Sequence, residues 1–186
     1  MGKKFIACDA NGVITGLYDS EDSPPPMGES GVIAITDAQW AAYATQQTQW
    51  RIENGVLVQN PAPTAAQQLS EAKVAQNAVL NSSCARAIVS GFSSNALGAV
   101  FSYPSGITDQ SNQNTIAQYA GGGLLWCASN GAWMFKQHTQ TQAQAVVGSF
   151  VDWLNKCQSQ LVAYSERVNA ATTVADVQLI GWADPN

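Results

Sequence analysis

The sequence predicts an α+β protein: a small N-terminal β-rich unit (residues 1–60), a proline linker (61–68), and a helical domain (69–186). Three observations support this. The first 60 residues hold two Asn-Gly pairs between apolar runs, which favours tight hairpins. Two prolines in the linker interrupt regular structure. An apolar pattern with alternating spacings of three and four runs over three heptads near the C-terminus. The domain is therefore expected to combine a central β-hairpin with one long C-terminal helix.

Composition narrows the functional classes. Of 186 residues, 46% are hydrophobic and only 11% are charged, with a net charge of −5. The sequence has no basic patch to neutralise phosphates, which argues against nucleic-acid binding. No apolar run is long enough to span a bilayer, and the stretch after Lys3-Lys4 is too short for a signal peptide. The four cysteines lie far apart, so free thiols in a reducing compartment are expected.

The front unit is predicted to be mostly strand. Three prolines in residues 21–30 indicate a loop, since successive prolines cannot join a strand ladder. The expected elements are a hairpin around Asn11-Gly12, a strand at Gly31–Ile35, a short helix capped by Thr36 or Asp37, and a hairpin at Trp50–Val58 turning at Asn54-Gly55.

The first part of the rear domain is predicted as helix, strand, helix. Residues 65–90 are rich in Ala and Gln with apolar residues at helical spacings, and Thr64 can cap a helix there. Residues 96–105 are typical of a strand that Pro104 stops. A second helix is expected from Thr108 or Asp109 to about Ala120, with Ile116 and Tyr119 on its inner face.

The stretch 121–139 organises the rear domain. Asn130-Gly131 between apolar runs predicts a two-residue turn, which pairs Ser129 with Ala132, Ala128 with Trp133, Cys127 with Met134 and Trp126 with Phe135. Alternation then puts Trp126, Ala128, Trp133 and Phe135 on one face, and Leu125, Cys127 and Met134 on the other. Both faces are largely apolar, so both are expected to be covered.

A long helix is expected after this hairpin. Thr139 and Gln142 fit a capping box. The apolar stripe consists of Val147, Phe150, Leu154, Cys157, Leu161, Tyr164 and Val168. It can pack on its own domain, the favoured interpretation, or associate with a second copy through the 147–168 helix. A short last helix capped by Thr172 or Thr173 follows, and Trp182 is expected to close the core.

The sequence offers no catalytic, metal or cofactor site. Cys127 pairs near Met134, four residues before His138, which is too far for a thiol–imidazole hydrogen bond. A single His cannot supply a multi-His metal site. Residues 19–22 hold three acids without EF-hand spacing, which indicates a solvated loop. Gly121–Gly123 lacks the Lys and Ser/Thr of a phosphate loop. We therefore expect a non-enzymatic protein without cofactors.

Aromatic residues are the better functional lead, because Trp and Tyr are enriched in interface hot spots. Trp40, Tyr43 and Trp50 lie in the small front unit and are the candidate partner-binding residues. The alternative is that they form the core of this unit, since small units are short of core residues.

An ordered series of short phrases in the rear half resembles a phage domain of unknown function that occurs in tail-fibre assembly and tail-fibre proteins. The series covers about Cys84 to Trp182 and consists of Leu97-Gly98, Tyr103-Pro104-Ser105, Asp109-Gln110, Asn112, Cys127, Trp133-Met134-Phe135, His138-Thr139, Gln142, Thr172-Thr173 and Trp182. The front half is similar in layout to tail-fibre assembly chaperones of contractile phages and phage-tail-like bacteriocins.

The resemblance implies a chaperone that works in the bacterial cytoplasm during virion assembly. It would bind the C-terminal, distal region of a trimeric tail fibre and help it fold and trimerise, and then leave or stay on the fibre tip. The alternative is a structural fibre or tip component that binds host surface glycan through exposed aromatics. Residues 1–60 carry seven acids and three bases and offer short strands, so the front unit is expected to make most of the fibre contact.

Overall fold

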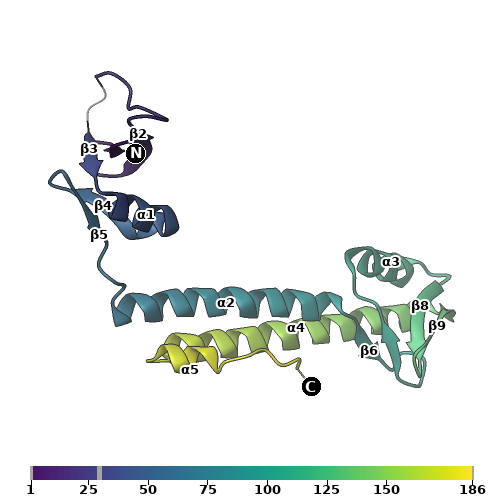
Figure 1. Ribbon diagram of the computed structural model, residues 1–186. Helices are drawn as coiled ribbons and strands as arrows, with labels where there is room; N and C mark the ends of the chain where they lie inside the picture. Colours follow the sequence, from purple (N-terminus) through teal and green to yellow (C-terminus); the bar gives the residue numbers. More distant parts are fainter. Residues whose placement is uncertain (1, 29–30, 186) are drawn as a thin grey trace. The chain divides into compact units, whose positions relative to one another are not determined.

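The computed structural model describes residues 2–28 and 31–185, and it divides into two compact units, residues 1–63 and 64–186 (Figure 1). Helix accounts for 47% of the chain and strand for 24%, in several small sheets beside long helices. This confirms the predicted α+β class. None of the helices in the described ranges is both long and apolar enough to cross a membrane.

The first unit contains a three-stranded antiparallel sheet in the order β2-β1-β3 and a separate hairpin, β4-β5. Ile6, Tyr43 and Leu57 form its buried core. The elements are β1 (Lys4–Cys8), β2 (Ile14–Asp19), β3 (Val32–Ile35), α1 (Asp37–Thr45), the 3₁₀ turn η1 (Gln47–Gln49), β4 (Trp50–Glu53) and β5 (Val56–Gln59).

The two hairpins of this unit turn differently. Asn54 and Gly55 both have positive φ, at 52° and 78°, as a type I′ turn requires, so the β4-β5 prediction is confirmed. The turn between β1 and β2 does contain Asn11-Gly12, but it runs from residue 9 to residue 13. There the Asp9 carboxylate accepts hydrogen bonds from the backbone N–H groups of Asn11 and Val13, both at 2.9 Å. This side-chain turn replaces the expected two-residue one.

The acidic loop after β2 is less solvated than expected. Asp19 is buried, forms an ion pair with Lys4 and accepts a hydrogen bond from the Glu21 N–H at 2.8 Å. The Lys4 hydrogen bond, helped by that of Glu21, lowers the pKa of the Asp19 carboxyl. The solvated-loop prediction was therefore wrong for Asp19, whose ion pair with Lys4 connects the loop to β1. Residues 29 and 30 of the predicted 21–30 loop lie outside the described ranges.

The second unit contains a four-stranded antiparallel sheet in the order β6-β7-β8-β9, together with four helices. Helix α2 lies along α4, and α5 packs against α2 (Figure 1). The elements are α2 (Ala65–Val89), β6 (Phe92–Ser94), β7 (Phe101–Tyr103), α3 (Ile107–Gln118), β8 (Gly123–Ser129), β9 (Ala132–His138), α4 (Gln140–Ala170) and α5 (Val174–Gln178).

Two expectations, for the end of the linker and for the strand at 96–105, need correction. A capping box of Thr64 and Gln67 starts α2 at Ala65, so residues 65–68 are helix and not linker. The strand expected at 96–105 pairs only at Phe101–Tyr103, because Gly98 (φ 83°) lies in a turn that follows the unpredicted strand β6.

Helix α3 also differs from expectation. It starts at Ile107 after Gly106, which offers no capping side chain, and not at Thr108 or Asp109. Tyr119 is exposed, whereas Gln113 is buried on the inner face. Gln113 can occupy that position because its amide donates a hydrogen bond to the Pro104 carbonyl at 2.8 Å.

The long helix follows the prediction closely. Thr139 and Gln142 form the capping box, and Thr173 caps α5. The stripe on α4 is used inside its own unit: Val168 packs with Leu80 of α2, and Cys157 packs with Cys84. Trp182 packs against both clusters. Self-association through 147–168 stays a prediction.

Candidate functional site

The β8-β9 hairpin has the register that the sequence predicts. Trp126 lies opposite Phe135, and Ala128 lies opposite Trp133. The turn is tight because Asn130 and Gly131 both adopt positive φ, at 50° and 79°. Alternation along the strands then places large aromatic side chains together on one face of the hairpin.

Only one face of this hairpin is covered. On the covered face, Leu125 and Cys127 are almost fully buried among residues of α3 and α4. On the other face the exposed fractions are 58% for Leu124, 40% for Trp126, 46% for Trp133 and 63% for Phe135. These four residues form what we name the open aromatic face. The prediction that both faces are covered was therefore wrong.

The rings of the open aromatic face support one another. The centroids of Trp126 and Phe135 are 4.7 Å apart with a 57° tilt, and Trp126 stacks on Trp133 at 6.1 Å. Both separations lie in the range of favourable aromatic pairs. The face is therefore an ordered platform before any partner arrives, which lowers the entropy lost on binding.

The same hairpin presents a strand edge. In the described ranges, β9 is the last strand of the order β6-β7-β8-β9 and pairs only with β8. An edge strand carries backbone N–H and C=O groups that can pair with an added strand. The edge and the aromatic face adjoin at Trp133 and Phe135, so one partner segment can use both.

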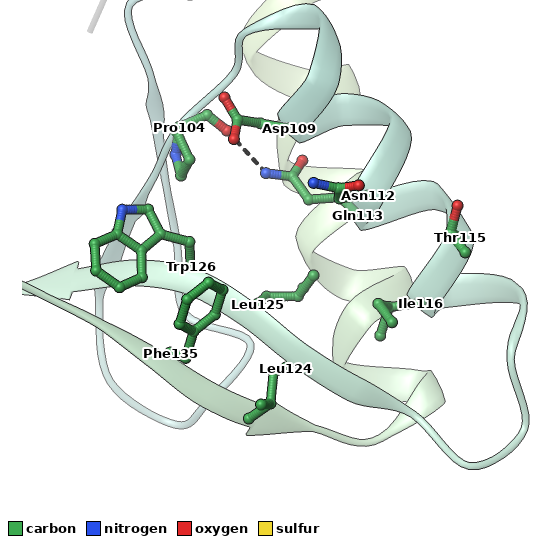
Figure 2. A pocket seen from close by; sticks show the side chains of 10 residues that line it. All are labelled: Pro104, Asp109, Asn112, Gln113, Thr115, Ile116, Leu124, Leu125, Trp126 and Phe135. Atoms are coloured by element: carbon green, nitrogen blue, oxygen red, sulfur yellow. Dashed lines mark hydrogen bonds between the residues drawn. The ribbon is translucent and has the colours of Figure 1, made fainter.

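A cavity of about 500 Å³ lies between α3 and this hairpin (Figure 2). Leu124, Trp126 and Phe135 form the hairpin wall, and Asp109 and Asn112 line the helical wall. The volume is within the range of small-molecule sites, roughly 300–1,000 Å³.

His138 is a structural residue at the end of β9. It is fully buried, and its Nδ1 lies 2.8 Å from the Lys136 carbonyl oxygen, which can only accept. In the neutral ring Nε2 is then the acceptor, and it receives the Tyr103 hydroxyl at 2.8 Å. Both ring nitrogens are thus occupied, and neither is left for Cys127. Burial also raises the pKa of the Cys127 thiol, the opposite of what a nucleophile needs.

The front-unit candidates lie largely within their own unit. Tyr43 is 8% exposed in the core, and Trp50 is half-buried against that core. Trp40 is half-buried, with the Lys4 ammonium 5.2 Å from its ring centroid. Tyr43 is therefore a core residue and Trp50 packs against the core, while Trp40 and Trp50 are both partly exposed.

Sequence reasoning located the aromatic hairpin but missed its open face. The apolar pattern on both faces is compatible with either a covered or an open outer face. Gln137, which shares the outer face with Trp133 and Phe135 and is exposed, is a polar residue that favours the open one. In the ranges 2–28 and 31–185, no group of three or more His, Cys, Asp or Glu side chains could hold a metal ion. The site is therefore defined by aromatic surface and a cavity.

Comparisons with protein-family models, with curated proteins and with solved structures found no match for this chain. Its fold and site define it as a two-unit α+β protein with an exposed aromatic hairpin.

Proposed function

We propose that the protein is a tail-fibre assembly chaperone of a phage or a phage-tail-like bacteriocin. It acts in the host cytoplasm, where it binds the C-terminal region of a tail fibre and assists folding and trimerisation. The observation that carries the proposal is the open aromatic face of Leu124, Trp126, Trp133 and Phe135. Tail fibres are proposed as the partner because the series of phrases between Cys84 and Trp182 resembles a domain of tail-fibre and tail-fibre assembly proteins.

The open aromatic face suits a client that has not finished folding. Before trimerisation, a fibre chain exposes apolar surface and unpaired strand edges, which lead to aggregation. The aromatic platform can cover apolar surface, and the neighbouring β9 edge can pair with a client strand by β-augmentation. Contiguous exposed apolar patches commonly mark interaction sites in soluble proteins.

This proposal moves the main fibre contact from the front unit to the rear unit. Tyr43 and Trp50 are committed to the front core, whereas the rear unit presents the aromatic surface. The acidic front unit then contributes chiefly to encounter rate and specificity, the usual effect of charge complementarity.

Co-expression tests the chaperone role. The fibre protein encoded beside this chain is produced with and without it, and soluble trimer is measured by size-exclusion chromatography. The proposal predicts more soluble trimer with the chain, and a loss of that gain with the Trp133→Thr and Phe135→Thr double variant. Equal trimer yield without the chain would contradict the proposal.

A second candidate is a structural fibre-tip component that binds host glycan. The cavity beside Trp126 favours it, because it joins an aromatic ring to polar side chains. Purified phage particles can be analysed for the presence of this chain. Its complete absence from the particles rules out a tip component. Presence alone does not discriminate, since a chaperone can also stay on the fibre.

A further inference from the structure

The cavity between α3 and the hairpin has two walls of different chemistry (Figure 2). Trp126 and Phe135 form a partly exposed aromatic wall, with their rings tilted by 57° to each other. The opposite wall is one face of α3, because residues 109, 112, 113 and 116 recur at helical spacing. A ligand in this cavity contacts aromatic rings on one side and polar groups on the other.

The polar wall offers unused hydrogen-bonding groups. Among the residues that the structure describes, the Asp109 carboxylate and the Asn112 amide make no hydrogen bond or ion pair. Gln113, by contrast, is buried and fixed by the bond from its amide to the Pro104 carbonyl. Gln113 thus holds the wall in place, while Asp109 and Asn112 are free to bind a ligand.

This donor and acceptor set selects among ligands. An anion would meet the Asp109 carboxylate, and a purely apolar ligand would leave that carboxylate and the Asn112 amide buried without partners, which is costly. A simple cation would use the Asp109 carboxylate and the Asn112 amide oxygen but would leave the amide N–H donors without a partner. A neutral polyol satisfies all of them, because each hydroxyl both donates and accepts: Asp109 accepts, and Asn112 does both.

A pyranose ring also matches the aromatic wall. One side of the ring presents C–H groups that pack on an aromatic face, while hydroxyls project from its rim. We propose that this cavity binds a neutral pyranose, with its C–H side on Trp126 and its hydroxyls on Asp109 and Asn112. Phe135 closes the hairpin side. The inference deepens the second candidate function and shares Trp126 and Phe135 with the open aromatic face. It is distinguished from the fibre contact by Asp109 and Asn112 of α3, which the chaperone proposal does not use.

The test uses the full chain and a panel of methyl pyranosides with axial and equatorial hydroxyls, with sorbitol as an acyclic control. Binding is followed by the indole N–H signal of Trp126 in nitrogen-15 spectra. We expect at least one pyranoside, and not sorbitol, to shift that signal in a saturable way. The proposal is overturned if no pyranoside shifts the signal. If only a fibre fragment shifts it, the cavity binds protein and not sugar.

Variants then locate the binding. Asn112→Ala and Asp109→Ala are each expected to weaken the bound pyranoside at least about tenfold, the effect of losing ~1.4 kcal/mol of binding free energy. Asn114→Ala, on the same helix but outside the cavity, is the matched control and should bind like the wild type. Trp126→Leu should abolish binding. Because this variant lacks the reporter indole, its binding is measured by calorimetry or by protection against chemical cross-linking. Unchanged affinity in Asn112→Ala and Trp126→Leu would place the sugar elsewhere and overturn the assignment.

Discussion

Trp126 and Phe135 lie directly opposite each other on β8 and β9, with ring centroids 4.7 Å apart, yet both keep a large exposed fraction. A cross-strand aromatic pair stabilises a hairpin even at the surface. The pair therefore serves the fold and remains available to a partner. Some residues around this pair stabilise the unit, and others are available to bind a partner.

Leu80 is expected to be essential for the packing of α2 against α4 and α5. It is fully buried with Val168, Val177 and Ile180, so Leu80→Ala should lower the free energy of unfolding by about 2–5 kcal/mol. The neighbouring Val79 is exposed, and Val79→Ala should stay within about 0.5 kcal/mol of the wild type. Urea denaturation measures both, and equal losses would contradict the helix packing described above.

Thr139 is expected to stabilise the start of α4. Its hydroxyl accepts the Gln142 N–H at 3.2 Å, so Thr139→Ala should cost about 1 kcal/mol of unfolding free energy. Thr141→Ala, in the first turn of the same helix but outside the cap, is the control and should have a smaller effect. A thermal shift no larger for Thr139→Ala than for Thr141→Ala would count against the capping box.

The Tyr103 hydroxyl is expected to stabilise the folded protein because it donates a hydrogen bond to the buried His138. Tyr103→Phe leaves the buried His138 Nε2 without a donor, at a cost of about 1–3 kcal/mol. Tyr119→Phe removes an exposed hydroxyl and should be nearly neutral. Denaturant unfolding at pH 7 compares the two, and a neutral Tyr103→Phe would refute this role.

Tyr103 also gives a pH dependence with a definite sign. Burial raises the pKa of Tyr103 above its ordinary value, so the native state keeps the proton after the unfolded chain loses it near pH 10. The unfolded state then binds fewer protons, and stability falls as the pH rises above about 10. The fall should be shallower in Tyr103→Phe, and parallel curves for the two proteins above pH 10 would contradict the burial of this phenol.

The four cysteines are expected to differ in reactivity. Cys84, Cys127 and Cys157 are buried, and burial raises their pKa values, whereas Cys8 is half-buried. Because the thiolate is the reactive form, a thiol reagent should modify Cys8 first and the other three only on unfolding. Cys8→Ser should remove the fast phase. A fast phase that survives this substitution would mean that a buried thiol is accessible.

Local signals in the sequence predicted much of the fold. Asn54-Gly55 and Asn130-Gly131 set the backbone of their own turns, and Thr36, Thr64, Thr139 and Thr173 satisfy backbone N–H groups within three residues. Such elements form through interactions between near neighbours in the chain. Their register and starting points can therefore be read without tertiary information.

Elements that depend on distant contacts were predicted less well. The short strands β6 and β7 pair with each other and β7 meets β8 at a single residue pair, Ser102 with Ala128, so little sequence pattern marks them. The buried Gln113 amide is satisfied by the Pro104 carbonyl, a partner that no local pattern identifies. Apart from one polar residue on β9, no local pattern indicates the open aromatic face either, because whether Trp133 and Phe135 are covered depends on where the helices pack.

The most direct test of the account is the affinity of the purified full chain for a C-terminal fragment of the tail fibre. Calorimetry would compare the wild type with the Trp133→Thr and Phe135→Thr double variant, in which threonine keeps a high strand propensity. Trp40→Thr in the front unit and Leu179→Thr at the exposed C-cap of α5 are the controls. We predict a loss of at least about 100-fold in affinity for the double variant, since hot-spot aromatics each contribute about 2 kcal/mol or more, with both controls near the wild type. Wild-type affinity in the double variant, together with a loss in Trp40→Thr, would contradict the account and return the fibre contact to the front unit.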